Sequence, residues 1–164
     1  MPPTDRALHA ALIEALTPIT RWRHPYPADG KPVLVNQAGV DVWENHVGDV
    51  RIDPDGTAHA YLFIQTGPGS YIQPRAVTTA TYTTWRPIVT VAAGTPVKAM
   101  WALDKVRPLL DGLTLTDLSG RELTAPLHEG FDRRETYDPG PLRLDEDPSP
   151  PRWYVPIQYA TTAH

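Results

Sequence analysis

The last fifteen residues of the chain carry the pattern that most restricts its fold. From Trp153 to Thr161, large apolar or β-branched side chains occupy alternate positions, which is the period of a half-buried strand. Pro156 lies in the middle of this run and has no N–H group to donate to a neighbouring strand. Because proline in a strand is tolerated at sheet edges and bulges, the pattern predicts an edge strand rich in aromatic residues.

Two segments upstream have the period of amphipathic helices. The first covers residues 5–17 and is preceded by Thr4, a residue type that caps helix N-termini. The second covers 95–112, with Thr95 as its cap and Pro96 at the first helical position, where a missing N–H group costs nothing. The predicted core positions of the first helix are Leu8, Leu12 and Leu16, and those of the second are Val97, Met100, Leu103, Val106 and Leu110.

The remaining elements are predicted from alternation and from turn residues. The sequence "DPDG" at 53–56 is turn-forming and is expected to join strands 47–52 and 58–66 in a hairpin. A further strand is expected at 85–94, a second hairpin around Ser119-Gly120, and loops at 24–32, 67–81 and about 128–151. This order predicts one α+β domain over residues 1–164, a single mainly antiparallel β-sheet with two helices packed on one face.

Composition and charge narrow the classes of function. The chain has no cysteine, which excludes disulfides, thiolate metal sites and thiol nucleophiles. Its formal net charge is −4 and it has no run of Lys or Arg, so a phosphate-gripping surface is disfavoured. No apolar run approaches the roughly 18 residues of a membrane helix, and residues 1–16 do not have the pattern of a secretory signal. We therefore expect a soluble protein that does not associate with membranes.

A catalytic or metal site finds little support in the sequence. His46 and Asp49 lie close together near Glu44, and His59 is across the predicted hairpin, a grouping that could supply a base and an orienting carboxylate. No nucleophile elbow, metal-type histidine spacing or phosphate loop accompanies it. The "DPDG" turn lacks the further oxygen ligands of a calcium loop. We expect no enzyme activity and no cofactor; a small enzyme that uses His46, Asp49 and His59 stays as an alternative.

The closing strand offers candidates for an interface. Arg, Trp and Tyr are the residue types enriched where binding energy concentrates, and unpaired strand edges attract other chains. Neighbours in a strand point to opposite faces, so Trp153 and Tyr154 are expected to face in opposite directions. The interface candidates are Arg152, Trp153, Tyr154 and Tyr159. An acidic cluster, Asp145, Glu146 and Asp147, is read either as a solvated loop or as a wall that repels passing DNA.

Three stretches of the chain are distinctive in their order and spacing: "LHAALIEALTPIT" (8–20), "AMWALDKVRPLLDGLTL" (99–115) and "PPRWYVPIQYATT" (150–162). Together they resemble the tail terminator (tail-completion) proteins of long-tailed phages, especially those that infect actinobacteria. Residues 31–60 follow no family pattern, and the acidic stretch 128–149 is longer than that of the family.

The resemblance implies an α+β subunit that assembles with copies of itself into a ring, typically a hexamer. Such a ring caps the tail tube, ends its polymerisation and offers a joining surface to the head–tail connector. Its partners would be its own copies, the tail tube protein and the connector protein, with DNA passing through unbound. The protein would be assembled in the host cytoplasm and reside in the virion at the tail neck. Another neck component, or a monomeric binding module, is the alternative.

Overall fold

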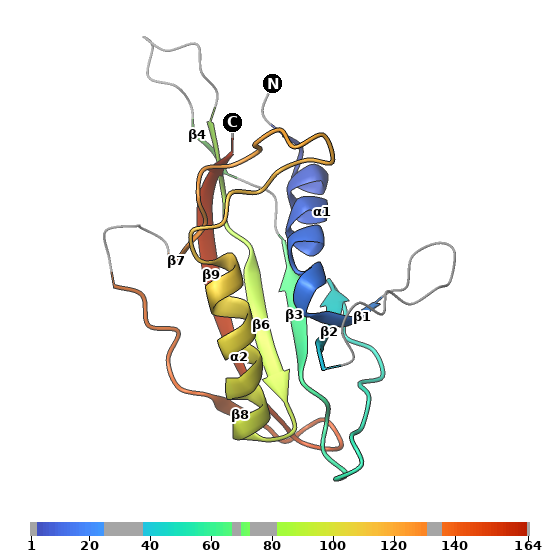
Figure 1. Ribbon diagram of the computed structural model, residues 1–164. Coiled ribbons are helices and arrows are strands. Elements are labelled where there is room, and N and C mark those ends of the chain that lie inside the picture. Colours follow the sequence, from blue (N-terminus) through green and yellow to red (C-terminus); the bar gives the residue numbers. More distant parts are fainter. Residues whose placement is uncertain (1–2, 25–37, 67–69, 73–81, 131–135, 164) are drawn as a thin grey trace.

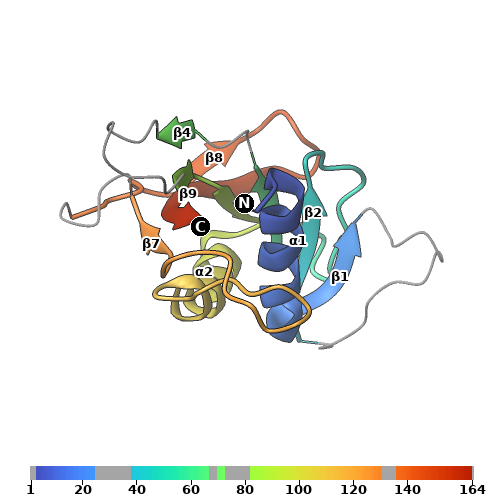
Figure 2. The same ribbon diagram turned by 90° about the horizontal axis from the view of Figure 1, so that it is seen from above.

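The computed structural model describes residues 3–24, 38–66, 70–72, 82–130 and 136–163 (Figure 1). Its helical elements are α1 (Asp5–Ala15), the short 3-10 helix η1 (Thr17–Ile19) and α2 (Pro96–Leu110). Its strands are β1 (Thr20–His24), β2 (Val40–Glu44), β3 (Tyr61–Gln65), β4 (Ser70–Ile72), β5 (Tyr82–Trp85), β6 (Ile88–Ala93), β7 (His128–Glu129), β8 (Arg143–Asp145) and β9 (Arg152–Ala163). Both α-helices lie on one side of a single sheet (Figure 2), which confirms the predicted fold class.

The sheet follows the order β1-β2-β3-β6-β9-β5-β4, with β7 and β8 also paired to β9. Pairing is parallel from β1 through β3 and antiparallel elsewhere. Strands β5 and β6 follow each other along one flank of β9, because Thr83 is opposite Ala163 and Val89 is opposite Ile157. The long last strand therefore pairs with four other strands, β5, β6, β7 and β8.

Helix α1 forms where the sequence predicts it. The Ala7 N–H group donates to Thr4 Oγ1 at 3.2 Å, and Asp5 lies in the first turn, where its charge favours the helix dipole. Leu8, Leu12 and Leu16 are all fully buried. This stripe fixes which side of the helix meets the sheet.

Helix α2 has its predicted ends and part of its predicted core face, because Val106 and Leu110 are buried and Leu103 packs against the core. Thr95 Oγ1 accepts the Lys98 N–H group at 3.2 Å, and Gly112 adopts a positive φ just after the helix. The predicted placement of Val97 and Met100 in the core is wrong, because both are exposed. Small side chains let a helix lie close to a sheet, and the buried positions recur at helical spacing: Ala99, Ala102, Val106 and Leu110.

Strand β9 is not the edge strand that its proline predicts. Along the flank opposite β5 and β6, β8 pairs with its first residues and β7 pairs with Tyr159 and Ala160. The Tyr159 N–H group donates to Pro87 O at 2.9 Å, whereas the Gln158 N–H group points to the other flank and donates to Tyr137 Oη at 2.9 Å. By strand alternation the missing N–H group of Pro156 faces the gap between β8 and β7, where no ladder bond is lost.

The predicted hairpin of 47–52 with 58–66 is wrong as well. Residues 47–52 form no strand, and the pairing across the "DPDG" turn is limited to an isolated bridge between Ile52 and Ala58 and a few backbone hydrogen bonds beside it. The second predicted hairpin is likewise reduced to a bridge between Thr116 and Glu122. The predicted strand 85–94 corresponds to β6. Strands β1, β2, β4, β5, β7 and β8 were not predicted, and most of the predicted loop 24–32 lies outside the described residues.

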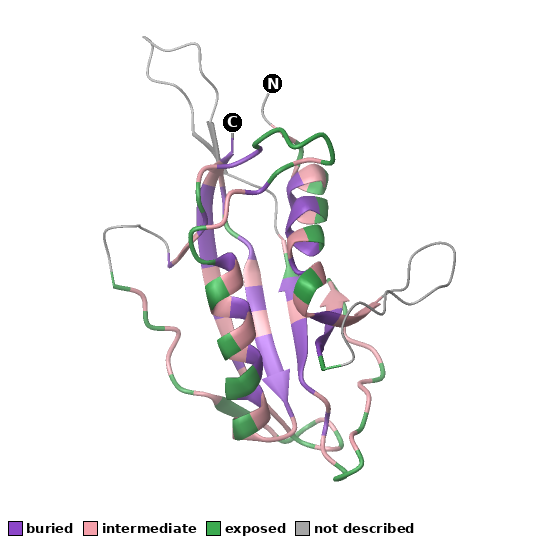
Figure 3. Cartoon of the chain, in the orientation of Figure 1, coloured by how far each residue is buried: buried purple, intermediate pink, exposed green. Residues whose placement is uncertain are grey.

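The core lies between the helices and the sheet, where the strands are largely buried (Figure 3). Its largest fully buried side chains are Trp85, Tyr159, Leu8, Leu12, Leu16, Leu62, Ile64, Leu110, Leu115, Leu127 and Ile157. This cluster links both helices to β3, β6 and β9 and so holds the helix layer on the sheet.

Gly94 joins β6 to α2 at a point where backbones touch. A Cβ atom there would collide with the Ala58 backbone nitrogen and lie 2.6 Å from Thr57 Cβ. We expect Gly94→Ala to lower the free energy of unfolding by about 1–3 kcal/mol or more, because the 53–58 turn must shift. Urea denaturation followed by circular dichroism measures this loss. Gly120→Ala, with a positive φ but open space around it, should cost less; equal losses would contradict the steric explanation.

Candidate functional site

The sheet face opposite the helices carries a shallow pocket of ≈ 250 Å³. Side chains that point to this face come from alternate residues of β3, β6 and β9. The pocket is lined by Val47, Tyr61, Phe63, Gln65, Thr90, Ala92, Asp145, Arg152 and Tyr154. We call this pocket, with its lining residues, the open-face pocket. Three residues that were predicted from the sequence, Asp145, Arg152 and Tyr154, lie together in it.

Arg152 is held in a fixed position at one wall of the open-face pocket. Its Nη1 atom donates to Tyr61 Oη at 3.3 Å, and its guanidinium carbon lies 5.7 Å from the centre of the Tyr61 ring. Asp145 is directly opposite Arg152 in the β8–β9 ladder. Burial raises the pKa of Tyr61, so its hydroxyl stays protonated near neutral pH. The wall therefore combines a cation, a carboxylate and a neutral phenol.

The other nominated residues of β9 are placed differently. Tyr154 lines the open-face pocket, so its neighbour Trp153 points to the helix side, as predicted. Tyr159 is fully buried in the core and has no surface to offer a partner, which removes it from the interface. Burial raises the pKa of Tyr159 well above its ordinary value, and its hydroxyl has no hydrogen-bond partner among the described residues.

The acidic cluster divides between the open-face pocket and solvent. Asp145 is half-buried, and its Oδ1 atom accepts the Asp147 N–H group at 3.3 Å. Glu146 and Asp147 are exposed in the turn after β8. Of the three carboxylates in this cluster, only those of Glu146 and Asp147 are exposed to solvent, where a polyanion such as DNA could pass.

The residues of the alternative enzyme site do not come together. His46 and Asp49 are exposed, and within the described residues no hydrogen bond joins either of them to His59. The two ring nitrogens of His59 face Asp53 Oδ1 at 2.8 Å and Gly39 O at 3.1 Å. In the part of the chain that the structure describes, no three His, Asp or Glu residues are grouped as metal ligands would be.

His59 instead belongs to a polar network at the "DPDG" turn. Lys98 Nζ donates to Asp53 Oδ2 at 2.7 Å and lies 2.8 Å from Asp55 Oδ2. Burial acts to raise the pKa of Asp53, but hydrogen bonds from Lys98 and His59 outweigh it and lower that pKa. The network ties the first turn of α2 to the turn, which is a structural role.

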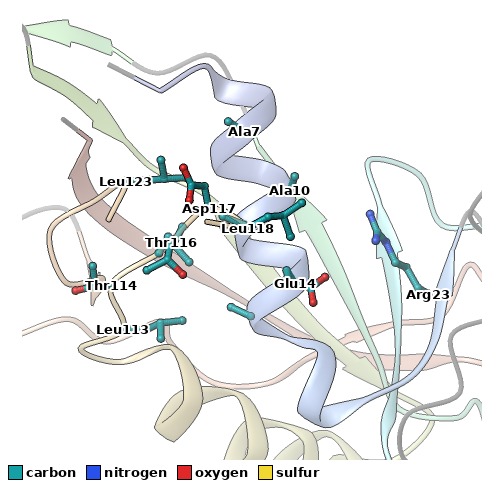
Figure 4. A pocket seen from close by; sticks show the side chains of 13 residues that line it. Ala7, Ala10, Glu14, Arg23, Leu113, Thr114, Thr116, Asp117, Leu118 and Leu123 are labelled. Carbon is teal, nitrogen blue, oxygen red and sulfur yellow. The ribbon is translucent and has the colours of Figure 1, made fainter. Parts of the chain in front are cut away.

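Two surfaces on the helix side were not predicted. The first is the α2 patch, formed by Val97, Met100 and Trp101, whose exposed fractions are 76%, 57% and 37%. The second is a hollow of ≈ 580 Å³ beside α1, the α1 groove (Figure 4). It is lined by Ala7, Ala10, Ala11, Glu14, Ala15 and Arg23 on one side and by residues 113–118 and Leu123 on the other. The alanines at 99 and 102 are the sequence feature that could have revealed which side of α2 is exposed.

No protein-family model matches this chain, and no curated protein matches it either. Within the described residues, neither helix is long and apolar enough to cross a membrane.

Proposed function

We propose that this protein is a structural subunit of a phage tail, a terminator whose copies form a ring on the end of the tail tube. The ring stops addition of tube protein and presents a joining surface to the head–tail connector. The chain performs no catalysis in this role and needs no cofactor. Another position in the neck is the nearest alternative within the same class.

The observation that carries the proposal is the large amount of apolar side chain left on an otherwise well-packed chain. The α2 patch exposes three large residues at adjacent helical positions, and Leu118 is fully exposed at the tip of the 113–123 segment. Contiguous exposed apolar surface is typical of sites where proteins meet other proteins. A subunit of a permanent assembly uses such surfaces to contact its neighbouring subunits.

The resemblance supports the same conclusion from the fold. The stretch 8–20 contains most of α1 and all of η1, 99–115 contains most of α2, and 150–162 contains nearly all of β9. Buried residues of all three stretches belong to the same core cluster, so these stretches are parts of one structural unit. Glu146 and Asp147 remain the candidates for a channel wall, because exposed carboxylates repel DNA phosphates.

Deletion of the gene from the phage or tail-like particle that encodes it tests the proposed role. We expect overlong or headless tails in electron micrographs, because nothing ends tube growth or offers the connector a surface. Expression of the intact chain from a plasmid should restore tail length and serves as the control. Tails of normal length attached to unfilled heads would contradict the proposal and indicate a role in the head.

A further inference from the structure

We propose that the α2 patch of one copy docks into the α1 groove of a second copy, so that the copies join head to tail. This inference rests on the proposed function, because it names the surfaces by which the ring would be made. Its occupant is another copy of this chain, and the contact uses two different surfaces of each copy.

The α2 patch has the form of a protruding apolar contact. Val97, Met100 and Trp101 are spaced three and four residues apart, so their side chains stand together on one face of the helix. The opposite face of α2 packs on the sheet through Ala99 and Ala102, which leaves the three larger side chains outside. Lys105 Nζ lies 4.7 Å from the centre of the Trp101 ring, so a cation is fixed on the aromatic face of the patch.

The α1 groove is the matching recess. Four alanines with small side chains form its α1 wall, and leucines of the 113–123 segment form the facing wall (Figure 4). Its volume of ≈ 580 Å³ is in the range of about 300–1,000 Å³ in which proteins enclose substantial ligands. Large apolar side chains protrude at the α2 patch, and the α1 groove is a recess between small alanines and apolar leucines, so the two surfaces are complementary in shape and apolar character.

The two surfaces also carry opposite charges. Glu14 is exposed at the groove and has no ion-pair partner among the described residues. Arg23, the cation of the groove, is already bound by Glu44 Oε2 at 2.9 Å. The groove therefore presents an unneutralised carboxylate to the cation that Lys105 places on the α2 patch. Electrostatic complementarity of this kind favours the intended partner and orients its approach.

The two surfaces of one copy cannot meet each other. The α2 patch is in the first half of α2, and the 113–123 wall of the groove begins only after the helix ends. From Trp101 to Leu110 alone, the helix advances about 14 Å at 1.5 Å per residue. A contact of patch with groove must therefore join two copies, and head-to-tail contacts of this type close into a ring when the rotation between copies allows.

Cysteine cross-linking tests this contact without interference, because the chain has no cysteine of its own. Met100→Cys is placed in the patch and Ala10→Cys in the groove, and a short bismaleimide reagent is added to mixtures of the two variants. We expect heterodimers from the mixture, and a ladder of covalent multimers from the double variant, both in solution and in purified particles. Ile52→Cys replaces another exposed apolar residue outside both surfaces and should give no product with Ala10→Cys.

The outcomes separate this contact from its competitors. Homodimers from Met100→Cys alone would show that patch meets patch, and the absence of products above the Ile52→Cys control, in solution and in particles, would overturn the proposal.

A Met100→Glu change should weaken self-association about 30-fold or more, as expected for a central interface side chain. Cross-linking together with normal tails after gene deletion would leave this contact standing and reject the terminator role. Overlong tails after gene deletion, without cross-links between the cysteine variants, would support the terminator role and reject this contact.

Discussion

Replacement of Trp85 by alanine is expected to lower the free energy of unfolding by about 3–5 kcal/mol. Trp85 ends β5, lies opposite Thr161 of β9 and is fully buried in the core. Its removal leaves a cavity at the point where β5 passes into β6, because the surrounding strands are held by β9 and cannot close in. A domain of this size is typically stable by about 5–15 kcal/mol, so the loss is a large part of the total. Urea denaturation followed by far-ultraviolet circular dichroism measures it.

Trp85→Phe is the matched variant for this prediction. The Trp85 Nε1 atom is buried and has no hydrogen-bond partner among the described residues. Phenylalanine keeps most of the apolar volume and discards a donor that gains nothing from burial, so its loss of stability should be much smaller. If alanine and phenylalanine destabilise the protein equally, the tryptophan is not packed as the structure has it.

The helices were predictable from the sequence because their determinants are local. The hydroxyl oxygens of Thr4 and Thr95 each accept a hydrogen bond from the N–H group of the residue three positions later. The strands β1 and β2 were missed because their parallel pairing joins residues far apart in the chain, and no turn residue marks it. The proline in β9 led to the wrong prediction of an edge strand, because the sequence does not reveal which flank of the strand its missing N–H group faces.

The candidate surfaces were predictable only in part. Alternation placed Arg152 and Tyr154 on one sheet face, where both line the open-face pocket. Val97 and Met100 of the α2 patch were wrongly assigned to the core, because large apolar residues and small ones both recur at helical spacing in α2. Packing selected the alanines, since they let the helix approach the sheet, and this choice depends on the shape of the sheet. The α1 groove has no counterpart in the sequence, because its walls come from segments about a hundred residues apart.

Replacement of Arg51 by methionine is expected to destabilise the protein by about 3–5 kcal/mol at neutral pH, because it leaves a buried carboxylate without its partner. Asp41, in β2, is only 2% exposed, and Arg51 Nη2 donates to its Oδ1 atom at 3.1 Å. The double variant Asp41→Leu, Arg51→Met is the matched control. It removes both charges together and should recover much of the loss, since apolar replacements of buried pairs are often neutral.

The pH dependence of the Arg51→Met variant follows from the pKa of Asp41. Burial raises that pKa above its ordinary value of 3.8, while the charge of Arg51 opposes the rise. The folded state therefore holds this proton more tightly than the unfolded state, and the free energy of unfolding falls as pH rises from 3.8 through the raised pKa. Without Arg51 the pKa rises further, so the deficit of the variant relative to the wild type should shrink on acidification from about pH 7 towards about pH 4. Urea titrations of both proteins across this range measure the difference, and a deficit that does not change with pH would mean that Asp41 is not the group left unpaired.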